Sequence, residues 1–161
     1  MDLKEFFLKQ KQATYEGVVK VFTKIPSNQL AWRPVSSVLS LGEIVRHVWM
    51  SEEGSRRMAL NGDWSYFEKR VPLGLEAVLG EVRLLDDEMR QLARVHEETL
   101  RDVRAFPLER WDEERVHEGF KMRRKVAVAL FGINEHQIHH RGQVTTYLRI
   151  LTGERASAYD L

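Results

Sequence analysis

Two of the six histidines in this chain, His136 and His140, stand four residues apart. On an α-helix this spacing separates two side chains by about 40° around the axis, so both imidazoles can reach one metal ion. Counted from His136 at about 100° per residue, the apolar residues of the same segment lie between about 20° and 60°, so both histidines point into the apolar face. Buried imidazoles are costly unless something satisfies their nitrogens. The pair is therefore either part of a metal site or two core histidines bonded to backbone or water.

A third imidazole is available from a separate segment. His47 flanks an apolar arc that ends at Val48, where a ligand projecting between packed helices would lie. The alternative is a histidine at the edge of the core, bonded to solvent. Three neutral imidazoles would form an open site, in which zinc keeps a fourth position for water or substrate. Nickel, iron and cobalt also accept imidazole, and such a site would lower the pKa of a bound water or thiol.

Composition narrows the classes of function. The 161 residues include no cysteine, which excludes disulfides, thiolate nucleophiles and sulfur-ligated zinc. The 25 Lys and Arg residues against 24 Asp and Glu give a net charge of +1, which argues against a general nucleic-acid binder. No apolar run is long enough to span a membrane, and the N-terminus lacks the apolar stretch of a signal peptide. We therefore expect a cytoplasmic protein that does not enter membranes.

The elements that must position the histidines are long amphipathic helices. Apolar spacing predicts them over about residues 2–24, 40–61, 75–106 and 125–151. Ser40 and Glu43 form the pattern of a capping box at the start of the second helix, and Gly153 suits a left-handed cap after the fourth. Residues 108–124 fit a short hairpin or an irregular crossover. Four such helices in one small domain, residues 1–161, bury their apolar stripes on one another, which predicts an all-α four-helix bundle.

Three segments also resemble a known family. Residues 30–34 (LAWRP), 40–47 (SLGEIVRH) and 136–143 (HQIHHRGQ), followed by a tail that contains Tyr159 and Asp160, are similar to the DinB/YfiT-like superfamily of metalloenzymes. Each motif is short, and their order and separation make the match specific. The resemblance extends from about residue 32 to residue 160, with only amphipathic character in the middle.

The resemblance implies an up-down-down-up connection of the four helices and a homodimer. It implies a divalent metal, zinc or nickel, held by His47, His136 and His140. Known activities in the family include transferases and isomerases that use a low-molecular-weight thiol. Fold and metal transfer from a family better than substrate does.

Two functions follow as expectations. The first is a metal-dependent enzyme of the thiol-transferase or hydrolase type, acting on a small-molecule substrate, with Arg141, Gln143 and Tyr147 as weaker candidates for its pocket. The second is a non-catalytic dimeric stress-response or binding module with a structural or vestigial metal. Turnover that is lost on chelation would separate the two.

Overall fold

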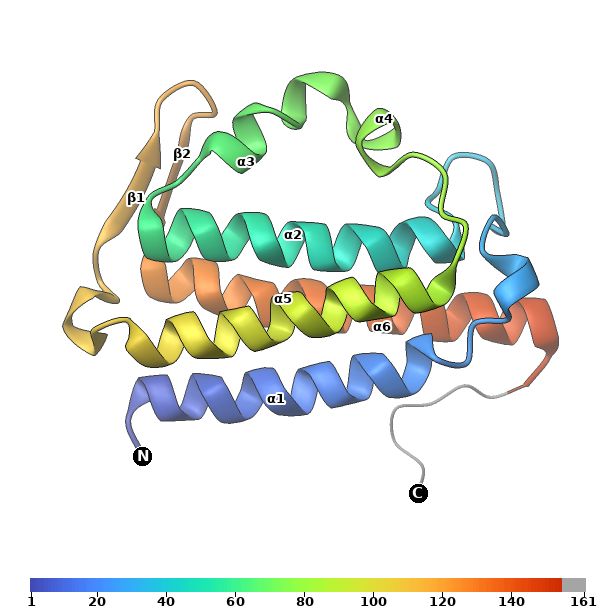
Figure 1. The fold of residues 1–161 in the computed structure, drawn as a ribbon, viewed down its shortest axis with the longest axis horizontal. Helices are drawn as coiled ribbons and strands as arrows, with labels where there is room; N and C mark the ends of the chain where they lie inside the picture. The colour runs from blue at the N-terminus through green and yellow to red at the C-terminus, as the bar shows by residue number, and fades with distance from the viewer. Residues whose placement is uncertain (155–161) are drawn as a thin grey trace.

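The computed structural model describes residues 1–154, and four long helices dominate it (Figure 1). These are α1 (Leu3–Phe22), α2 (Leu41–Asn61), α5 (Leu85–Ala105) and α6 (Val126–Thr152). The chain runs in one direction along α1 and α6 and in the opposite direction along α2 and α5, as the colours of Figure 1 show. The bundle and its up-down-down-up order are therefore confirmed. The tail residues Tyr159 and Asp160 lie outside the described residues.

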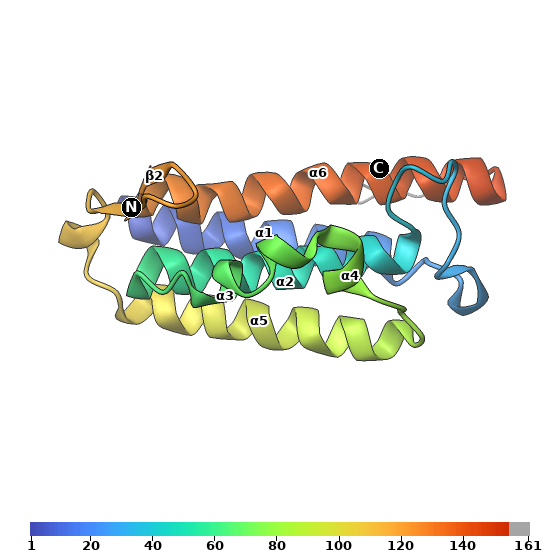
Figure 2. The ribbon, with the colours of Figure 1, turned by 90° about the horizontal axis from the view of Figure 1, so that it is seen from above.

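Each long helix packs on two others. The most extensive contacts join α2 with α5 and α6, and α1 with α6 and α5. The axes of the four long helices are nearly parallel in both views (Figure 1, Figure 2). No helix among residues 1–154 combines the length and apolar character that a membrane span requires.

Local signals in the sequence set the ends of these helices. The Ser40 hydroxyl accepts from the Glu43 backbone N–H at 3.3 Å, and the Glu43 carboxylate accepts from the Ser40 N–H at 2.7 Å, so the capping box is confirmed. Gly62 and Gly153 end α2 and α6 in the left-handed conformation. The predicted boundaries of all but the third helix agree to within two residues.

The third helix is shorter than its apolar stripe predicts. The expected helix over 75–106 is two helices, α4 (Leu75–Leu79) and α5, separated by residues 80–84. Gly80 adopts φ 55° and ψ −169°, a conformation outside the helical region that favours glycine, and it interrupts the backbone hydrogen bonds there. Apolar periodicity continues across this break, so the stripe alone could not reveal it.

An arch, which we define as residues 62–84, connects α2 to α5. It contains α3 (Ser65–Glu68), the 3₁₀ turn η2 (Val71–Leu73) and α4. The arch lies over α2 in both views (Figure 1, Figure 2). Because it returns the chain to the far end of the bundle, α5 can run in the same direction as α2.

A hairpin fills the ambiguous segment before α6. Strands β1 (Glu114–His117) and β2 (Met122–Lys125) pair antiparallel, with Glu114 opposite Lys125. The Arg115 side chain donates to the Ala59 carbonyl at 2.8 Å, which holds the hairpin against the end of α2. Two 3₁₀ turns, η1 (Ser27–Gln29) and η3 (Leu108–Arg110), complete the loops.

The core has two apolar ends and a polar layer between them. One apolar cluster gathers around Val18, Val48 and Val144, and the other around Phe7 and Met58. Between them, in sequence along their helices, three side chains are almost completely buried and bonded to one another: Lys11, Glu52 and Gln137. The three histidines of the predicted site stand beside this layer along α2 and α6.

Candidate metal centre

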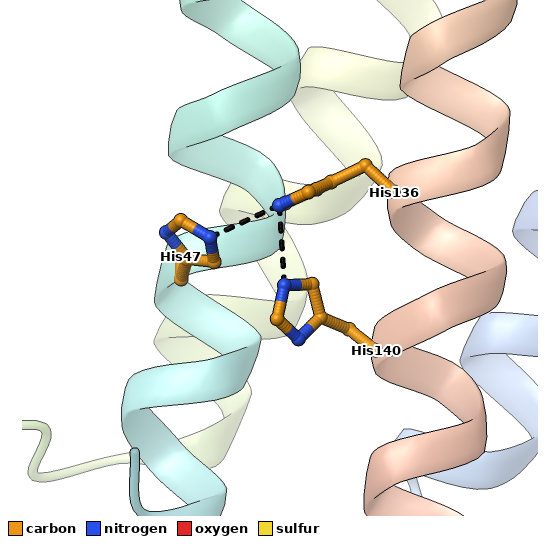
Figure 3. Close-up of side chains that lie close together, drawn as sticks. All are labelled: His47, His136 and His140. Atoms are coloured by element: carbon orange, nitrogen blue, oxygen red, sulfur yellow. Dashed lines mark hydrogen bonds between the residues drawn. The ribbon is translucent and has the colours of Figure 1, made fainter. Parts of the chain in front are cut away.

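The three predicted ligands converge from two helices (Figure 3). His47 projects from α2, and His136 and His140 project from α6. Nε2 of His136 lies 3.0 Å from Nε2 of His47 and 3.1 Å from Nε2 of His140. All three ligand atoms lie within 4.8 Å of one another. The juxtaposition predicted from the sequence is therefore present.

The arrangement of these nitrogens fits a cation better than it fits hydrogen bonding among the rings. A neutral imidazole Nε2 is either a donor or an acceptor, so the Nε2 atom of His136 cannot satisfy both neighbours if each of them also presents a lone pair. Tetrahedral zinc with bonds of about 2.0–2.1 Å holds its nitrogen ligands about 3.3 Å apart, close to the two short separations. The residues present thus fit a divalent metal held by three imidazoles.

Gln143 orients one of the three rings. Nδ1 of His140 lies 2.8 Å from Oε1 of Gln143, an amide oxygen that can only accept, so Nδ1 carries the proton. The neutral ring then presents its Nε2 lone pair to the other two histidines. Gln143 is itself held by Tyr147, whose hydroxyl accepts from Nε2 of Gln143 at 2.9 Å. Partners of this kind fix the tautomer and orientation of a metal-ligating histidine.

Burial keeps the three rings neutral. Burial, together with the neighbouring histidines acting in the same direction, lowers the pKa of His136 to about 3. It lowers the pKa of His140 to about 4, against the opposing effect of the Gln143 hydrogen bond. The pKa of His47 is also lowered by burial. Neutral imidazole is the form that binds a metal ion, so the set is ready for one at neutral pH.

The residues next to His47 fix α2 against the end of the arch. Arg46 donates to the carbonyls of Leu79 and Glu81 and to the carboxylate of Glu88 on α5. The indole N–H of Trp49 donates to the other Glu88 oxygen at 2.7 Å. Because Glu88 is almost completely buried, these bonds lie in a poorly solvated setting and hold His47 in a defined place.

A cavity opens beside His47. It has a volume of about 310 Å³ and lies between α2 and the arch. His47, Met50 and Ser51 line it from α2. The candidate metal centre is therefore next to a space that a small molecule can occupy.

The weaker sequence candidates do not line this cavity. Gln143 and Tyr147 stand behind His140, where they orient it, and Tyr147 packs edge-on against Trp32 with ring centroids 5.8 Å apart. The guanidinium of Arg141 lies against Gly17 of α1, on another face of α6. His139 is exposed beside His140.

Gly142 on α6 and Glu88 on α5 differ in how closely they are packed. Gly142 does not mediate a close helix contact, because an added Cβ there would meet no atom within 4 Å. Glu88 is not part of the solvated face of its helix. Its position three residues after Leu85 and four before Leu92 already places it on the apolar stripe, which is the signal that could have revealed its burial.

The polar layer is a feature that the sequence did not predict. Lys11, Glu52 and Gln137 each occupy a stripe position of their helix, and Gln137 directly follows His136. Nζ of Lys11 lies 3.1 Å from Oε2 of Glu52, and Nε2 of Gln137 donates to the same oxygen at 2.6 Å. Burial lowers the pKa of Lys11, and the Glu52 carboxylate opposes this effect.

Comparisons with known proteins agree with this architecture. The family model of the DinB superfamily matches residues 10–144. The crystal structure of a DinB-like protein from Bacillus subtilis, YjoA, superposes with a TM-score of 0.67 at 20% sequence identity, covering 97% of this chain and 94% of that one. No curated protein matches the sequence. At this identity the structural likeness establishes the fold, and the family model establishes the family.

Proposed function

Because the chain belongs to the DinB superfamily, we propose that its histidine cluster holds a divalent metal and serves a metal-dependent enzyme. The observation that carries the proposal is the approach of three Nε2 atoms from α2 and α6, with two separations of 3.0 and 3.1 Å. The metal would be zinc or nickel, the two implied by the family resemblance, and both accept imidazole nitrogen.

Each residue has a defined part in this proposal. The ion would be bound by the neutral imidazoles of His47, His136 and His140. Gln143 holds the proton of His140 on Nδ1, which leaves Nε2 free to bind the ion. A divalent ion held by three imidazoles, with a position left open, lowers the pKa of a bound water or thiol and polarises a carbonyl. The cavity beside His47 admits the small-molecule substrate and limits the water around it.

The reaction class is transfer to or from a low-molecular-weight thiol, or hydrolysis. The thiol comes from the family resemblance, since no residue of this chain identifies it. No cysteine is present to act as a nucleophile within the protein, so a thiol that takes part in the reaction must be supplied from outside. The resemblance also supports a homodimer.

Metal content tests the first half of the proposal. We expect the purified chain to bind one zinc or nickel ion after dialysis, and His136→Ala to bind none while keeping its helical circular dichroism. His139→Ala is the matched control, because this exposed neighbour on the same helix should leave the stoichiometry unchanged. A wild-type chain that stays metal-free after reconstitution with either ion would contradict the proposal.

Turnover tests the second half. We expect the reconstituted chain to have one of two activities: transfer of a low-molecular-weight thiol to an electrophile, or hydrolysis of an activated ester. Chelation of the metal should abolish that activity. If the metal-loaded chain turns over none of these substrates, and metal removal lowers the melting temperature, the ion is structural and the chain is a binding module.

A further inference from the structure

The cavity beside His47 has walls of a distinct chemical kind. The arch contributes mainly apolar side chains to it, among them Phe67, Val71, Val78 and Leu79, and α2 contributes Met50. At about 310 Å³, the volume is at the lower end of the ~300–1,000 Å³ that small-molecule sites occupy. The space therefore suits a small, largely apolar molecule rather than a polymer.

One charged side chain lines this cavity among the described residues. Arg70 forms no ion pair with any carboxylate in residues 1–154, although most of the other arginines there do. Its guanidinium stacks on the Tyr66 ring at 3.7 Å and donates one N–H to the Tyr66 carbonyl at 3.3 Å. The group is thus held in place, and the remaining donors of its planar fork are available for an anion.

Tyr66 fixes Arg70 at the wall of the cavity through the stacking contact of its ring. The residue is 5% exposed and lines the cavity, and its buried hydroxyl bonds to no atom in the described part of the chain. Burial raises the pKa of this hydroxyl to about 12, so it remains a neutral donor at physiological pH.

The arch packs closely against α2 through Tyr66 and Phe67. An added Cβ at Gly54 would lie 2.7 Å from Cδ1 of Tyr66 and 2.9 Å from Cζ of Phe67, so glycine is required for this close approach. Arg46 holds the other end of the arch through the Leu79 and Glu81 carbonyls. The cavity therefore lies under a segment that is attached to α2 at both ends.

We propose that this cavity binds a small molecule with an apolar body and one carboxylate, with Arg70 as its anion-binding residue. The apolar body would occupy the space between Met50, Phe67 and Leu79, which brings the molecule against His47. As the site of the substrate, this inference rests on the proposed metal-dependent function; as a binding site, it can be tested without the metal. A planar guanidinium pairs with a carboxylate through two parallel hydrogen bonds, and so favours it over a neutral polar group.

Octanoate, with octanamide as its neutral counterpart, is a suitable pair of probes for metal-free protein. We expect octanoate to bind at pH 7 with higher affinity than octanamide, as measured by calorimetry. In Arg70→Gln the octanoate affinity should fall roughly tenfold and the preference over octanamide should disappear. Arg124→Gln, which changes an exposed arginine of β2, is the matched control and should bind as the wild type does.

A measurement on the unmodified chain guards against a variant that fails to fold. In heteronuclear NMR spectra, octanoate should shift the backbone amides of residues 47–51 and 66–79 and few others. Absence of binding, shifts confined to other regions, or equal binding by Arg70→Gln and wild type would each overturn the inference.

The two proposals fail separately. His136→Ala should lose the metal and keep octanoate binding, because no residue of the cavity is changed. A chain that binds metal and not octanoate refutes the carboxylate site alone. A chain that binds octanoate and no metal refutes the metal centre and leaves the carboxylate site standing.

Discussion

The Nδ1 atom of His140 lies 2.8 Å from the Oε1 atom of Gln143, one turn further along α6. Since an amide oxygen only accepts, this contact decides which nitrogen of the imidazole carries the proton. It leaves the Nε2 lone pair of His140 facing His136 and His47. The sequence suggested Gln143 as a pocket residue; in the structure it orients the ring of His140.

Removing this contact should weaken the metal site without disturbing the bundle. We expect Gln143→Leu to lower metal affinity about 10- to 100-fold, because His140 loses the acceptor that fixes its tautomer. Tyr147→Phe should have a smaller effect, since it removes only the partner of Gln143. Titration against a chromophoric chelator measures both, with His139→Gln as the control. Unchanged affinity in Gln143→Leu would show that the contact does not orient a ligand.

Much of the fold follows from apolar periodicity and local caps. The stripes of α1, α2 and α6 and the capping box of Ser40 and Glu43 place three of the four helices to within two residues. The four-residue spacing of His136 and His140 predicts that both rings share one face of α6. The ring of His47 could be added only through its place beside an apolar arc and through the family resemblance.

Features that depend on three-dimensional pairing were beyond the sequence. Nothing in the stripe of residues 75–106 distinguishes the break at Gly80, because the apolar residues keep helical spacing across it. The stripe position of Glu88 signals its burial but not its partners, because Arg46 and Trp49 lie about 40 positions earlier in the chain. The proposed carboxylate site depends in the same way on the arch, whose Tyr66 and Phe67 pack on Gly54 and whose Arg70 lines the cavity.

Two glycines should respond in opposite ways to alanine. Gly54→Ala places a methyl group against Tyr66 and Phe67, which should cost about 1–3 kcal/mol by overpacking, partly offset by the helix propensity of alanine. Gly142→Ala meets no atom within 4 Å and should stabilise the chain by about 0.5–1 kcal/mol. Urea denaturation measures both free energies of unfolding. Gains of equal size in the two variants would mean that the arch does not pack on Gly54 as described.

The polar layer predicts a large cost for removing one charge alone. Lys11→Met leaves the buried carboxylate of Glu52 without its cation, which should destabilise the fold by about 3–5 kcal/mol. The triple variant Lys11→Met, Glu52→Leu and Gln137→Leu removes the whole polar set and should recover most of that loss. Chemical denaturation of the three proteins provides the comparison. A triple variant no more stable than Lys11→Met would contradict this account.

Because His96 is buried as a neutral ring, we expect the free energy of unfolding to decrease in acid. Burial lowers its pKa from 6.5 to about 3, with Lys11 and Arg104 acting in the same direction, while the ring stacks on Tyr15 and bonds to Gln12. Between these pH values the unfolded chain holds a proton that the folded chain does not, so the free energy of unfolding decreases as pH is lowered from about 6.5 towards 3.

The variant His96→Phe measures how much His96 contributes to this pH dependence. His96→Phe keeps an aromatic ring against Tyr15 and has no proton to bind, so its metal-free form should lose less stability than the wild type between pH 7 and pH 4.5. His139→Gln, at an exposed position, should retain the wild-type slope. Identical slopes for wild type and His96→Phe in urea denaturation would show that His96 is not held neutral by the fold.

X-ray absorption spectroscopy of the zinc-loaded chain tests the metal centre most directly, because it reports the atoms around the ion itself. We predict three imidazole nitrogens at about 2.0–2.1 Å with one further oxygen or nitrogen ligand, and loss of one imidazole from this shell in His47→Ala. A first shell dominated by oxygen, or a spectrum that is the same in wild type and His47→Ala, would contradict the assignment of these three histidines as the ligands.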